Sequence, residues 1–368
     1  MNTYPLESIN LEEAKKLQFK MIDCITKNFS GKEILNRGDL GVVMGLNKPE
    51  TTLKAEKAIA DFFGTESAVL TRGSGTGAIR WGLISFLKSG DTILIHKAPV
   101  YPTTEVTLQT MGINTVSADF NSKEETEKVL RENPEIKGVL VQHTRQKIDD
   151  SYVLGDVIKT VKDINKDLPV IVDDNYAIMK THKNGTDCGA DLSAFSCFKL
   201  LGPEGVGCVI GKKEFTEKII ALNYSGGSQV QGHEALDVLH GMVYAPVSLA
   251  LQAEVTEEVA KIINSGSIKG VKKAYIANSQ SKVLLVELEE DIAYDVLKEA
   301  EKMGAIPNPV GSESKYEFAP LFYRISGTFR KSDPGLEYRM IRINPMRSGP
   351  ETILRILENA VKNVWDKR

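Results

Sequence analysis

The sequence predicts an α/β fold, in which a mainly parallel β-sheet is sandwiched by helices and a smaller C-terminal α+β domain follows. Two observations lead to this prediction. Between about residues 50 and 210, short apolar runs alternate with helical patterns, and the runs are almost continuously apolar, as in strands that are buried on both faces. After about residue 245 a long helical pattern leads to mixed strands and helices, which indicates a second domain.

The chain of 368 residues is long enough for two domains with separate cores. We expect a large domain over residues 50–244 and a small domain over residues 245–368. Residues 1–49 include a predicted helix at 10–28 and the segment Gly38–Gly41. We expect them to pack on the small domain or to reach a partner subunit.

The elements of the large domain follow from its periodicity. An amphipathic helix is predicted at 50–63, because apolar residues recur at helical spacing until Gly64. Beyond it, apolar runs bounded by turn residues predict strands, and the amphipathic stretches between them predict helices. The predicted strands are 68–70, 92–95, 138–141 and 170–172, and the predicted helices are 76–88, 102–111, 122–132 and 155–166.

The small domain is predicted to begin with a long helix from Ser248 to Asn264. A strand over Ser281–Leu288 follows, because this segment is rich in β-branched and other apolar residues. The remaining predicted elements are a helix near 291–303, a strand near 340–344 and a final helix near 350–365.

Composition and charge exclude several classes of protein. Apolar and charged fractions of 42% and 26% are ordinary for a globular protein, and a net charge of −3 with interspersed signs argues against nucleic-acid and membrane partners. The four cysteines form no CxxC pair and the five histidines no HxH or HxxxH pair, so we expect no metal site. Without a recognisable signal peptide or membrane-spanning run, we predict a cytoplasmic protein with reduced thiols.

Lys199 has the most informative surroundings in the chain. The apolar, strand-like stretch Ser193–Phe198 leads into it, and the glycine-rich segment Gly202–Gly207 follows. Removing an amine from water lowers its pKa and frees its lone pair to attack a carbonyl carbon. The pattern therefore favours a lysine that forms an imine with a bound aldehyde, of which pyridoxal 5'-phosphate (PLP) is the commonest.

A glycine-rich segment, Arg72–Arg80, follows the first predicted strand and opens a helix. Its glycines allow backbone N–H groups to approach a phosphate, and Ser74 and Thr76 add hydroxyl groups. A dinucleotide-binding fingerprint is the rival interpretation, but the next strand ends in Ile95-His96-Lys97 and not in an acidic residue. A plain glycine turn is a further alternative.

Two residues at predicted strand ends suit the ring of PLP. Asp173 ends the strand at 170–172 and would keep the pyridine nitrogen protonated; a helix cap or turn is the alternative, and Asp174 is a second candidate. Tyr101 follows the second predicted strand, so we expect it at the same edge of the sheet. Its ring would stack on the cofactor or serve only for packing.

Arg342 lies between apolar residues on a predicted strand of the small domain. We predict that it binds a substrate carboxylate, with Tyr323 as a second substrate-binding residue. A structural ion pair is the alternative for Arg342. Neighbouring arginines would hold a second anionic group of the substrate or form a solvated basic face, namely Arg324, Arg330, Arg339 and Arg347.

In combination, these residues give the chain a resemblance to the fold-type I PLP enzymes, the aspartate aminotransferase superfamily. Ser196–Gly207 is similar to the S-x-x-K-x-x-G-P-x-G-x-G lysine motif of class-V aminotransferases and cysteine desulfurases. Tyr224–Gln229 resembles the GGGQ segment that reaches the phosphate of the neighbouring subunit in that class. Val172-Asp173 and Ala98–Tyr101 are also similar to cystathionine and methionine lyases. The whole chain most resembles the YhfS-type PLP enzymes, notably over Ala98–Thr104, Val141–Gln146 and Phe195–Lys199.

The resemblance implies PLP transferase fold type I with a seven-stranded type of sheet, PLP as cofactor, and a homodimer with its active site at the subunit interface. It implies catalytic roles for Lys199 as the Schiff-base lysine, Asp173 as the partner of the ring nitrogen and Tyr101 as the stacking ring, and it implies Arg342 as the carboxylate anchor. The cofactor-binding residues that we expect are Ser74, Gly75, Thr76, Tyr101, Gln142, Asp173, Ser196, Lys199, Ser228 and Gln229.

The chain departs from the pattern of its relatives at three places. Phe198 replaces the histidine usual before the class-V lysine, Gln142-His143 stands where many aminotransferases have Asn-Pro, and Cys197 lies inside the lysine motif and not on a flexible desulfurase loop. We predict an aminotransferase acting on an amino acid or related amine, with Lys199 shuttling a proton from Cα. The alternatives are β- or γ-elimination from a sulfur amino acid and, outside enzymes, a PLP- or nucleotide-binding protein.

Overall fold

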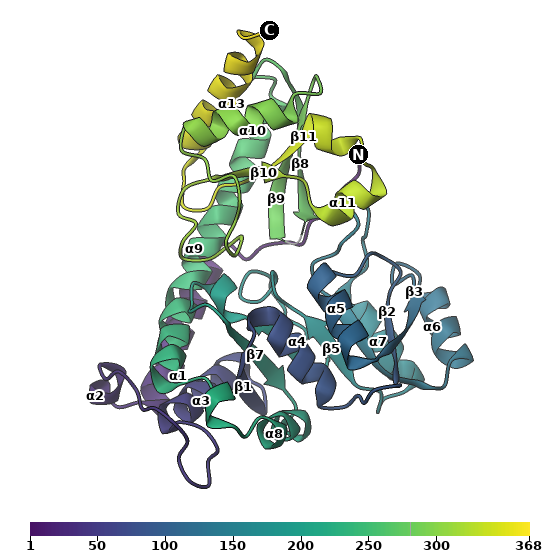
Figure 1. Cartoon of the computed structure of the whole chain (residues 1–368), viewed down its shortest axis with the longest axis vertical. Coiled ribbons are helices and arrows are strands. Elements are labelled where there is room, and N and C mark those ends of the chain that lie inside the picture. Colours follow the sequence, from purple (N-terminus) through teal and green to yellow (C-terminus); the bar gives the residue numbers. More distant parts are fainter. Residues whose placement is uncertain (280) are drawn as a thin grey trace. The chain divides into compact units, whose positions relative to one another are not determined.

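The computed structural model describes residues 1–279 and 281–368, which form two compact units (Figure 1). The large unit comprises Lys15–His143 and Ser151–Pro246. The small unit comprises Met1–Ala14, Thr144–Asp150 and Val247–Arg368. The predicted domain extents stay a prediction. In the structure the small unit also includes the N-terminal residues Met1–Ala14 and the short loop Thr144–Asp150.

The large unit is built on a seven-stranded sheet with the order β1-β7-β6-β5-β4-β2-β3. The pairs among β2, β3, β4, β5 and β6 are parallel, whereas β7 is antiparallel to both β1 and β6. This confirms the predicted mainly parallel sheet. The strands are β1 (Ser67–Arg72), β2 (Thr92–His96), β3 (Asn114–Ala118), β4 (Ile136–Gln142), β5 (Val170–Asp173), β6 (Leu192–Ser196) and β7 (Val206–Gly211).

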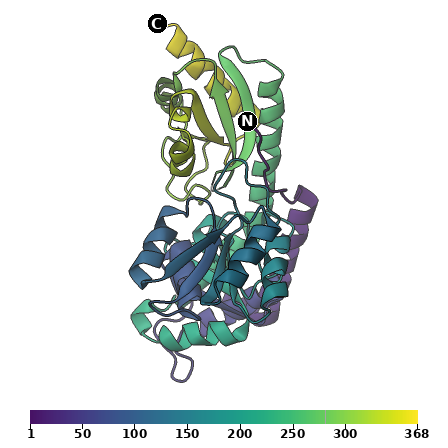
Figure 2. The same cartoon turned by 90° about the vertical axis from the view of Figure 1, so that its right-hand side faces the viewer.

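Successive residues of the central strands are buried in opposite faces of this sheet. Leu140 and Ile171 belong to a core that also contains residues of α4 and α8, whereas Val141 and Val172 belong to a core with residues of α6 and α7. Helices therefore cover both faces (Figure 2), which is why the strand sequences are apolar without alternation. The helices are α3 (Glu50–Phe63), α4 (Ser74–Ile84), α5 (Pro102–Met111), α6 (Lys123–Glu132), α7 (Leu154–Ile164) and α8 (Lys213–Leu222).

The small unit contains a four-stranded antiparallel sheet with the order β10-β11-β9-β8. Along β9, Leu284 and Val286 enter the core formed with α9, α10 and α13, while Val283 and Leu285 face a smaller cluster with Phe329. The elements are β8 (Val271–Ser279), β9 (Ser281–Leu288), α10 (Ala293–Lys302), β10 (Leu321–Arg324), α11 (Gly327–Ser332), α12 (Leu336–Arg339), β11 (Met340–Asn344) and α13 (Pro350–Trp365).

Several elements were not predicted from the sequence, namely α8, β8, β10, α11 and α12. Two others differ from the prediction for clear reasons. The helix predicted from Ser248 is α9 (Gly232–Asn264), which begins 16 residues earlier and runs through Pro246. Proline usually marks a helix boundary because it lacks an N–H donor, and here the two units divide at that residue. Strand β3 was not predicted, because it is mostly exposed and lacks an apolar run. The remaining short or N-terminal elements are α1 (Leu11–Asn28), α2 (Gly31–Ile34), and the 3₁₀ turns η1 (Cys197–Leu200) and η2 (Gly226–Ser228).

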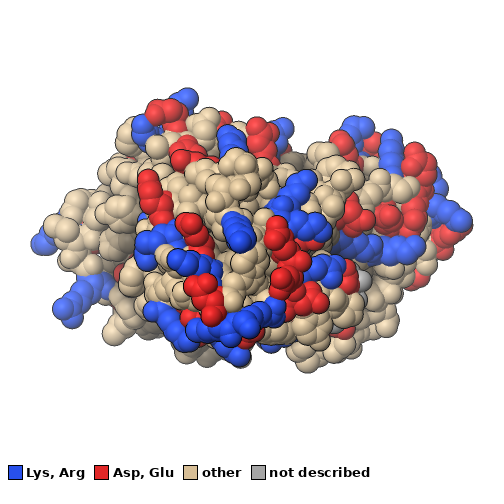
Figure 3. All heavy atoms as spheres, turned by 90° about the horizontal axis from the view of Figure 1, so that it is seen from above, with Lys and Arg blue, Asp and Glu red and all other residues tan. Residues whose placement is uncertain are grey.

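The surface carries mixed charge. On the face shown in Figure 3, basic and acidic side chains are interspersed and form no large patch of one sign. Among the described residues, none of the helices combines the length and the apolar composition needed to cross a bilayer.

Candidate active site

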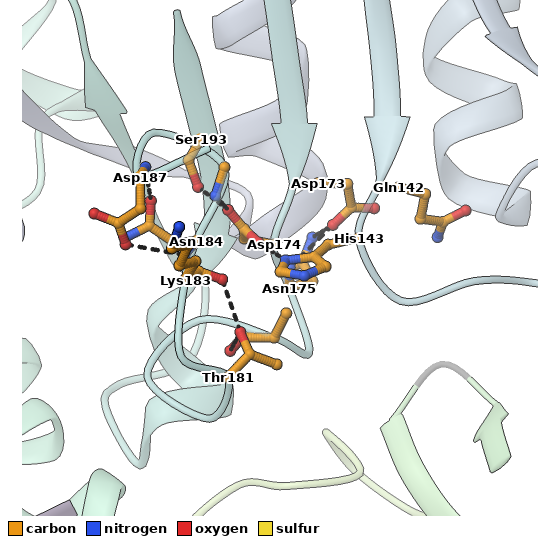
Figure 4. Close-up of polar contacts among 12 residues, drawn as sticks. Gln142, His143, Asp173, Asp174, Asn175, Thr181, Lys183, Asn184, Asp187 and Ser193 are labelled. Atoms are coloured by element: carbon orange, nitrogen blue, oxygen red, sulfur yellow. Dashed lines mark hydrogen bonds and ion pairs between the residues drawn. The ribbon is translucent and has the colours of Figure 1, made fainter. Parts of the chain in front are cut away.

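Most of the predicted site residues lie at one edge of the large sheet. Strands β1, β2, β4, β5 and β6 run in the same direction, so their carboxyl ends meet at that edge. Gln142 and Asp173 are register partners at the ends of β4 and β5 (Figure 4), and Ser196 ends β6. Three segments that are distant in the sequence are thereby brought together.

The glycine-rich loop joins this edge through its backbone. Gly73 and Ser74 adopt positive φ angles of 97° and 56°, and both of their N–H groups donate to the carbonyl of Gly205, at 2.8 and 3.0 Å. This turn places the Ser74 hydroxyl 2.5 Å from that of Ser196. Among the described residues, no side chain caps the N-terminus of α4 that follows, so this helix end presents its positive dipole without a side-chain acceptor.

Tyr101 precedes α5, and a contact between two helix starts brings it toward the same loop. The hydroxyl groups of Thr76 on α4 and Thr103 on α5 are 2.9 Å apart. Tyr101 is the residue immediately before α5, whose first position is Pro102. The structure therefore places Tyr101 two residues before a threonine whose hydroxyl contacts the glycine-rich segment.

Lys199 lies in the 3₁₀ turn η1, directly after β6. Its Nζ atom is 4.2 Å from the centroid of the Tyr176 ring, a distance typical of a cation–π contact. Tyr176 is almost fully buried and Lys199 is half-buried. The amine therefore lies against an aromatic ring, on a side chain that is partly exposed.

Asp173 carries a buried carboxyl group with an altered affinity for protons. Burial raises its pKa, while hydrogen bonds from Asn175 and the positive charge of Lys199 oppose that shift. Oδ1 of Asp173 accepts from Nδ2 and from the backbone N–H of Asn175, at 2.7 and 3.1 Å. A cationic partner, such as a protonated ring nitrogen, would stabilise the ionised form of this carboxyl group.

Asp174, the second candidate, is bound on both carboxylate oxygens by the protein. Oδ1 lies 2.6 Å from Nδ1 of His143, and Oδ2 accepts from the Gly185 N–H at 2.8 Å and from the Ser193 hydroxyl (Figure 4). The residue is fully buried. These contacts fix the chain after β5 and engage both carboxylate oxygens of Asp174, whereas the bonds from Asn175 engage only Oδ1 of Asp173 among the described residues.

Ser228 and Gln229 make their side-chain contacts within their own loop. The Ser228 hydroxyl donates to Ser225 at 2.9 Å, and the Gln229 amide donates to the carbonyl of Asn223. The carbonyl of Gln229 accepts from Arg72, two residues before Ser74, at 3.0 Å. The loop thus touches the glycine-rich segment through its backbone.

The predicted substrate-binding residues lie together in the small unit. The guanidinium carbon of Arg342 is 4.0 Å from the centroid of the Tyr323 ring, and its Nε donates to the carbonyl of Arg324 at 2.6 Å. Two of the neighbouring arginines, Arg324 and Arg330, form ion pairs with Glu337. The basic cluster is therefore partly neutralised by the protein itself.

The residues at the sheet edge fit the chemical groups of PLP. A phosphate dianion needs N–H and hydroxyl donors, and the start of α4 with Ser74, Thr76 and Ser196 offers both. A protonated ring nitrogen needs a buried carboxylate, which Asp173 provides. An aldehyde needs an amine, which Lys199 provides.

Three contact residues were not predicted from the sequence. Asn175 binds Asp173, Tyr176 contacts Lys199, and His143 binds Asp174. For Asn175 and Tyr176 the sequence signal is the unusual polar run after β5, Asp173-Asp174-Asn175-Tyr176, which does not include His143. Their roles depend on which segments the sheet brings beside that run.

Comparison with family models supports the same interpretation of the chain. A model described as aminotransferase class-V matches residues 44–284, and one described as the YhfS-like C-terminal domain matches residues 257–357. The uncharacterized protein YhfS of Escherichia coli (strain K12) is 50% identical over 364 residues, which cover 99% of this chain and 100% of that protein.

Solved structures extend the likeness to the whole fold. A crystal structure described as the pyridoxal-5'-phosphate dependent protein YhfS from Escherichia coli has 51% identity and a TM-score of 0.96, over 99% of this chain and 100% of that chain. A putative cystathionine beta-lyase involved in aluminum resistance from Listeria monocytogenes has 18% identity and a TM-score of 0.71, over 95% and 94% of the two chains. At that identity the second likeness concerns the fold alone.

Proposed function

Because this chain belongs to the aminotransferase class-V family, we propose that it is a PLP-dependent enzyme that acts at Cα of an amino acid or a related amine. The single observation that carries the proposal is the proximity, at one sheet edge, of the half-buried Lys199 to the buried carboxyl group of Asp173. The PLP-dependent protein YhfS, which shares 51% of its residues with this chain, supports the choice of cofactor.

The residues at the sheet edge have different proposed roles in binding PLP and in the reaction. Ser74, Gly75, Thr76 and Ser196 bind the phosphate, and Tyr101 stacks on the ring, with Gln142 beside it. Asp173 holds a proton on the ring nitrogen, so that bound PLP can accept the negative charge that develops at Cα. Lys199 would hold the cofactor through its aldehyde group, and its amine would carry the proton that leaves Cα of the substrate.

For the reaction itself, we propose transamination, with substrate carboxylate binding by Arg342 and Tyr323. Desulfuration needs a thiolate to receive sulfur. Burial raises the pKa of all four thiols, and three of them are buried: Cys24, Cys197 and Cys208, with Cys188 half-buried. Transamination and elimination, by contrast, need only a lysine as base.

The first test uses the purified protein. We expect an absorbance band of a PLP–lysine adduct, borohydride reduction of that band, and a reduced label that maps to Lys199. Lys199→Ala should lose the band. Lys180→Ala is the matched control, because Lys180 also contacts the Tyr176 ring, at 5.4 Å, and should keep it. A wild-type protein that PLP cannot label would refute the proposal, and unaltered PLP binding and activity in Lys199→Ala would favour a binding protein.

A second experiment distinguishes the reactions. With a 2-keto acid present as acceptor, transamination converts it to a new amino acid. Elimination from a sulfur amino acid instead releases ammonia and a thiol or sulfide without forming that amino acid. A panel of amino acids that yields ammonia but never a new amino acid would replace the aminotransferase proposal by a carbon–sulfur lyase.

We also propose a cytoplasmic homodimer, in which Ser228 faces the partner subunit, whereas the Gln229 side chain is buried and bound to Asn223 within its own loop. Loop 38–46 and loop 224–231 adjoin, since the Gly41 N–H donates to Gln231 at 2.7 Å. This surface exposes large apolar side chains, with Met44 98% and Leu40 74% exposed, as expected of a subunit interface. Leu40→Glu/Met44→Glu should shift the molar mass from dimer to monomer in light scattering, and a monomeric wild type with tightly bound PLP would contradict the proposal.

The four free thiols support the proposed location in a reducing compartment such as the cytoplasm.

A further inference from the structure

The backbone conformation at Gly75 does not require a glycine. This residue lies in the first turn of α4 and does not have a positive φ, unlike Gly73 at 97°. The reason for a glycine is therefore spatial. A Cβ atom at residue 75 would lie 1.9 Å from Oδ1 and 2.6 Å from Cγ of Asn175. The amide of Asn175 occupies the space that any side chain at position 75 would take.

The same amide is bound at its other end to Asp173. Nδ2 donates to Oδ1 of that carboxylate at 2.7 Å, and the backbone N–H adds a bond of 3.1 Å. Oδ1 of Asn175, by contrast, is buried against Gly75 without a hydrogen-bond partner among the described residues. A buried acceptor without a donor is unfavourable. The hydrogen bond that Nδ2 donates to Asp173 therefore explains why the Asn175 amide is oriented in this way.

From this arrangement we propose that Asn175 is a positioning residue, which locks the Asp173 carboxylate to the start of α4 by filling the space above Gly75. The inference rests on the proposed function, since it assigns α4 to the phosphate and Asp173 to the ring of PLP. Gly75 and Asp173 are 98 residues apart in the sequence and would lie at the two ends of the cofactor site. The side-chain amide of Asn175 then holds these two residues at a fixed distance from each other.

If the Asn175 amide positions Asp173 in this way, a second substitution at residue 175 should remove the effect of Gly75→Ala on the binding of PLP to apoprotein. Alanine at position 75 would push the amide back by about 1.5 Å to reach ordinary contact, which breaks the 2.7 Å bond to Asp173. We expect Gly75→Ala and Asn175→Ala each to weaken PLP binding by about tenfold or more, as for loss of a hydrogen bond to a charged group. The double variant should bind about as well as Asn175→Ala alone, because no amide remains to be displaced.

Gly31→Ala is the matched control. Gly31 also has no positive φ, nothing lies within 4 Å of the position that a Cβ atom would take there, and it is far in sequence from the site, so PLP binding should be unchanged. If the two single effects multiply in the double variant, residues 75 and 175 act independently and the lock is refuted. If Gly75→Ala fails to fold but the double variant folds, the rescue appears in its strongest form.

A spectroscopic pH titration tests the Asp173 end of the lock separately. Removing the Asn175 donors raises the pKa of Asp173, so PLP binding to apoprotein, followed by absorbance, should lose affinity on acidification at a higher pH in Asn175→Ala and in Gly75→Ala than in wild type. Asp174 and Lys199, the charged neighbours of Asp173, are unchanged in both variants. An unmoved titration would overturn the inference. If wild-type protein forms no adduct at Lys199, the proposed function itself has failed, and the two failures are thereby distinguished.

Discussion

Replacement of Lys48 by methionine should strongly destabilise the large unit. Lys48 and Glu56 form an ion pair of 2.5 Å whose side chains are only 2% and 4% exposed. Oε1 of Glu56 also accepts from the Leu70 N–H on β1 at 2.9 Å. Because water does not reach this pair, Lys48→Met leaves a buried carboxylate without its counter-charge. We expect a loss of about 3–5 kcal/mol in the free energy of unfolding, against about 0–1 kcal/mol for an exposed pair.

The loss should also depend on pH with a definite sign. Burial raises the pKa of Glu56 above 4.5 although Lys48 opposes the shift, and removal of Lys48 raises this pKa further. A carboxyl group with a raised pKa in the folded state favours folding below its unfolded pKa and loses that contribution as the pH rises. The deficit of Lys48→Met should therefore be largest at neutral pH and shrink as the pH falls toward 4.5.

Urea unfolding followed by tryptophan fluorescence can measure this effect. The two tryptophans lie in different units, so a Trp365→Phe background leaves Trp81 on α4 to report on the large unit alone. Lys48→Met/Glu56→Gln should recover most of the loss, because glutamine keeps an acceptor for Leu70 without a charge. Lys159→Met, which breaks an exposed pair with Asp163, is the control and should cost under about 1 kcal/mol. A similarly small cost for Lys48→Met, or a double variant no more stable than the single, would refute this reasoning.

Four further predictions concern single side chains. Asp173→Asn should bind PLP but lower kcat by about 10²–10³-fold, measured by steady-state kinetics, since the amide cannot balance charge on the ring nitrogen. Cys197→Ala should keep kcat within about threefold, because burial raises the pKa of that thiol, whereas a loss above about 100-fold would indicate thiol chemistry. His143→Gln should lower the free energy of unfolding by about 1–3 kcal/mol, since Asp174 loses a buried hydrogen bond, and an unchanged urea midpoint would contradict this. Hydrogen bonds from Ser314 and Gly311 lower the pKa of Glu317, although burial alone would raise it. The ionised carboxylate therefore stabilises the folded state above pH 4.5, and this contribution is lost as the pH falls. Glu317→Gln should be less stable than wild type at pH 7, and the difference should shrink in acid.

The fold class, the family and the strand ends at which we propose the site could be inferred from the sequence alone. Strands buried on both faces must be apolar throughout, so 92–95, 138–141 and 170–172 could be recognised, and the lysine motif around Lys199 indicated the family that the comparisons confirm. Predictions failed where local pattern carries little information. Strand β3 is mostly exposed, and α9 runs through Pro246, although a proline locally predicts a helix boundary.

Only the tertiary structure decided which side chains meet. Ser74 bonds to Ser196 across 122 residues, His143 to Asp174 across 31, and the Asn175 amide lies against Gly75. No periodicity records such pairs, because each depends on the order and direction of the strands in the sheet. The sequence shows that Asp173 ends a strand, whereas burial and the bonds from Asn175, which together set the proton affinity of that carboxyl group, exist only once the strands have assembled.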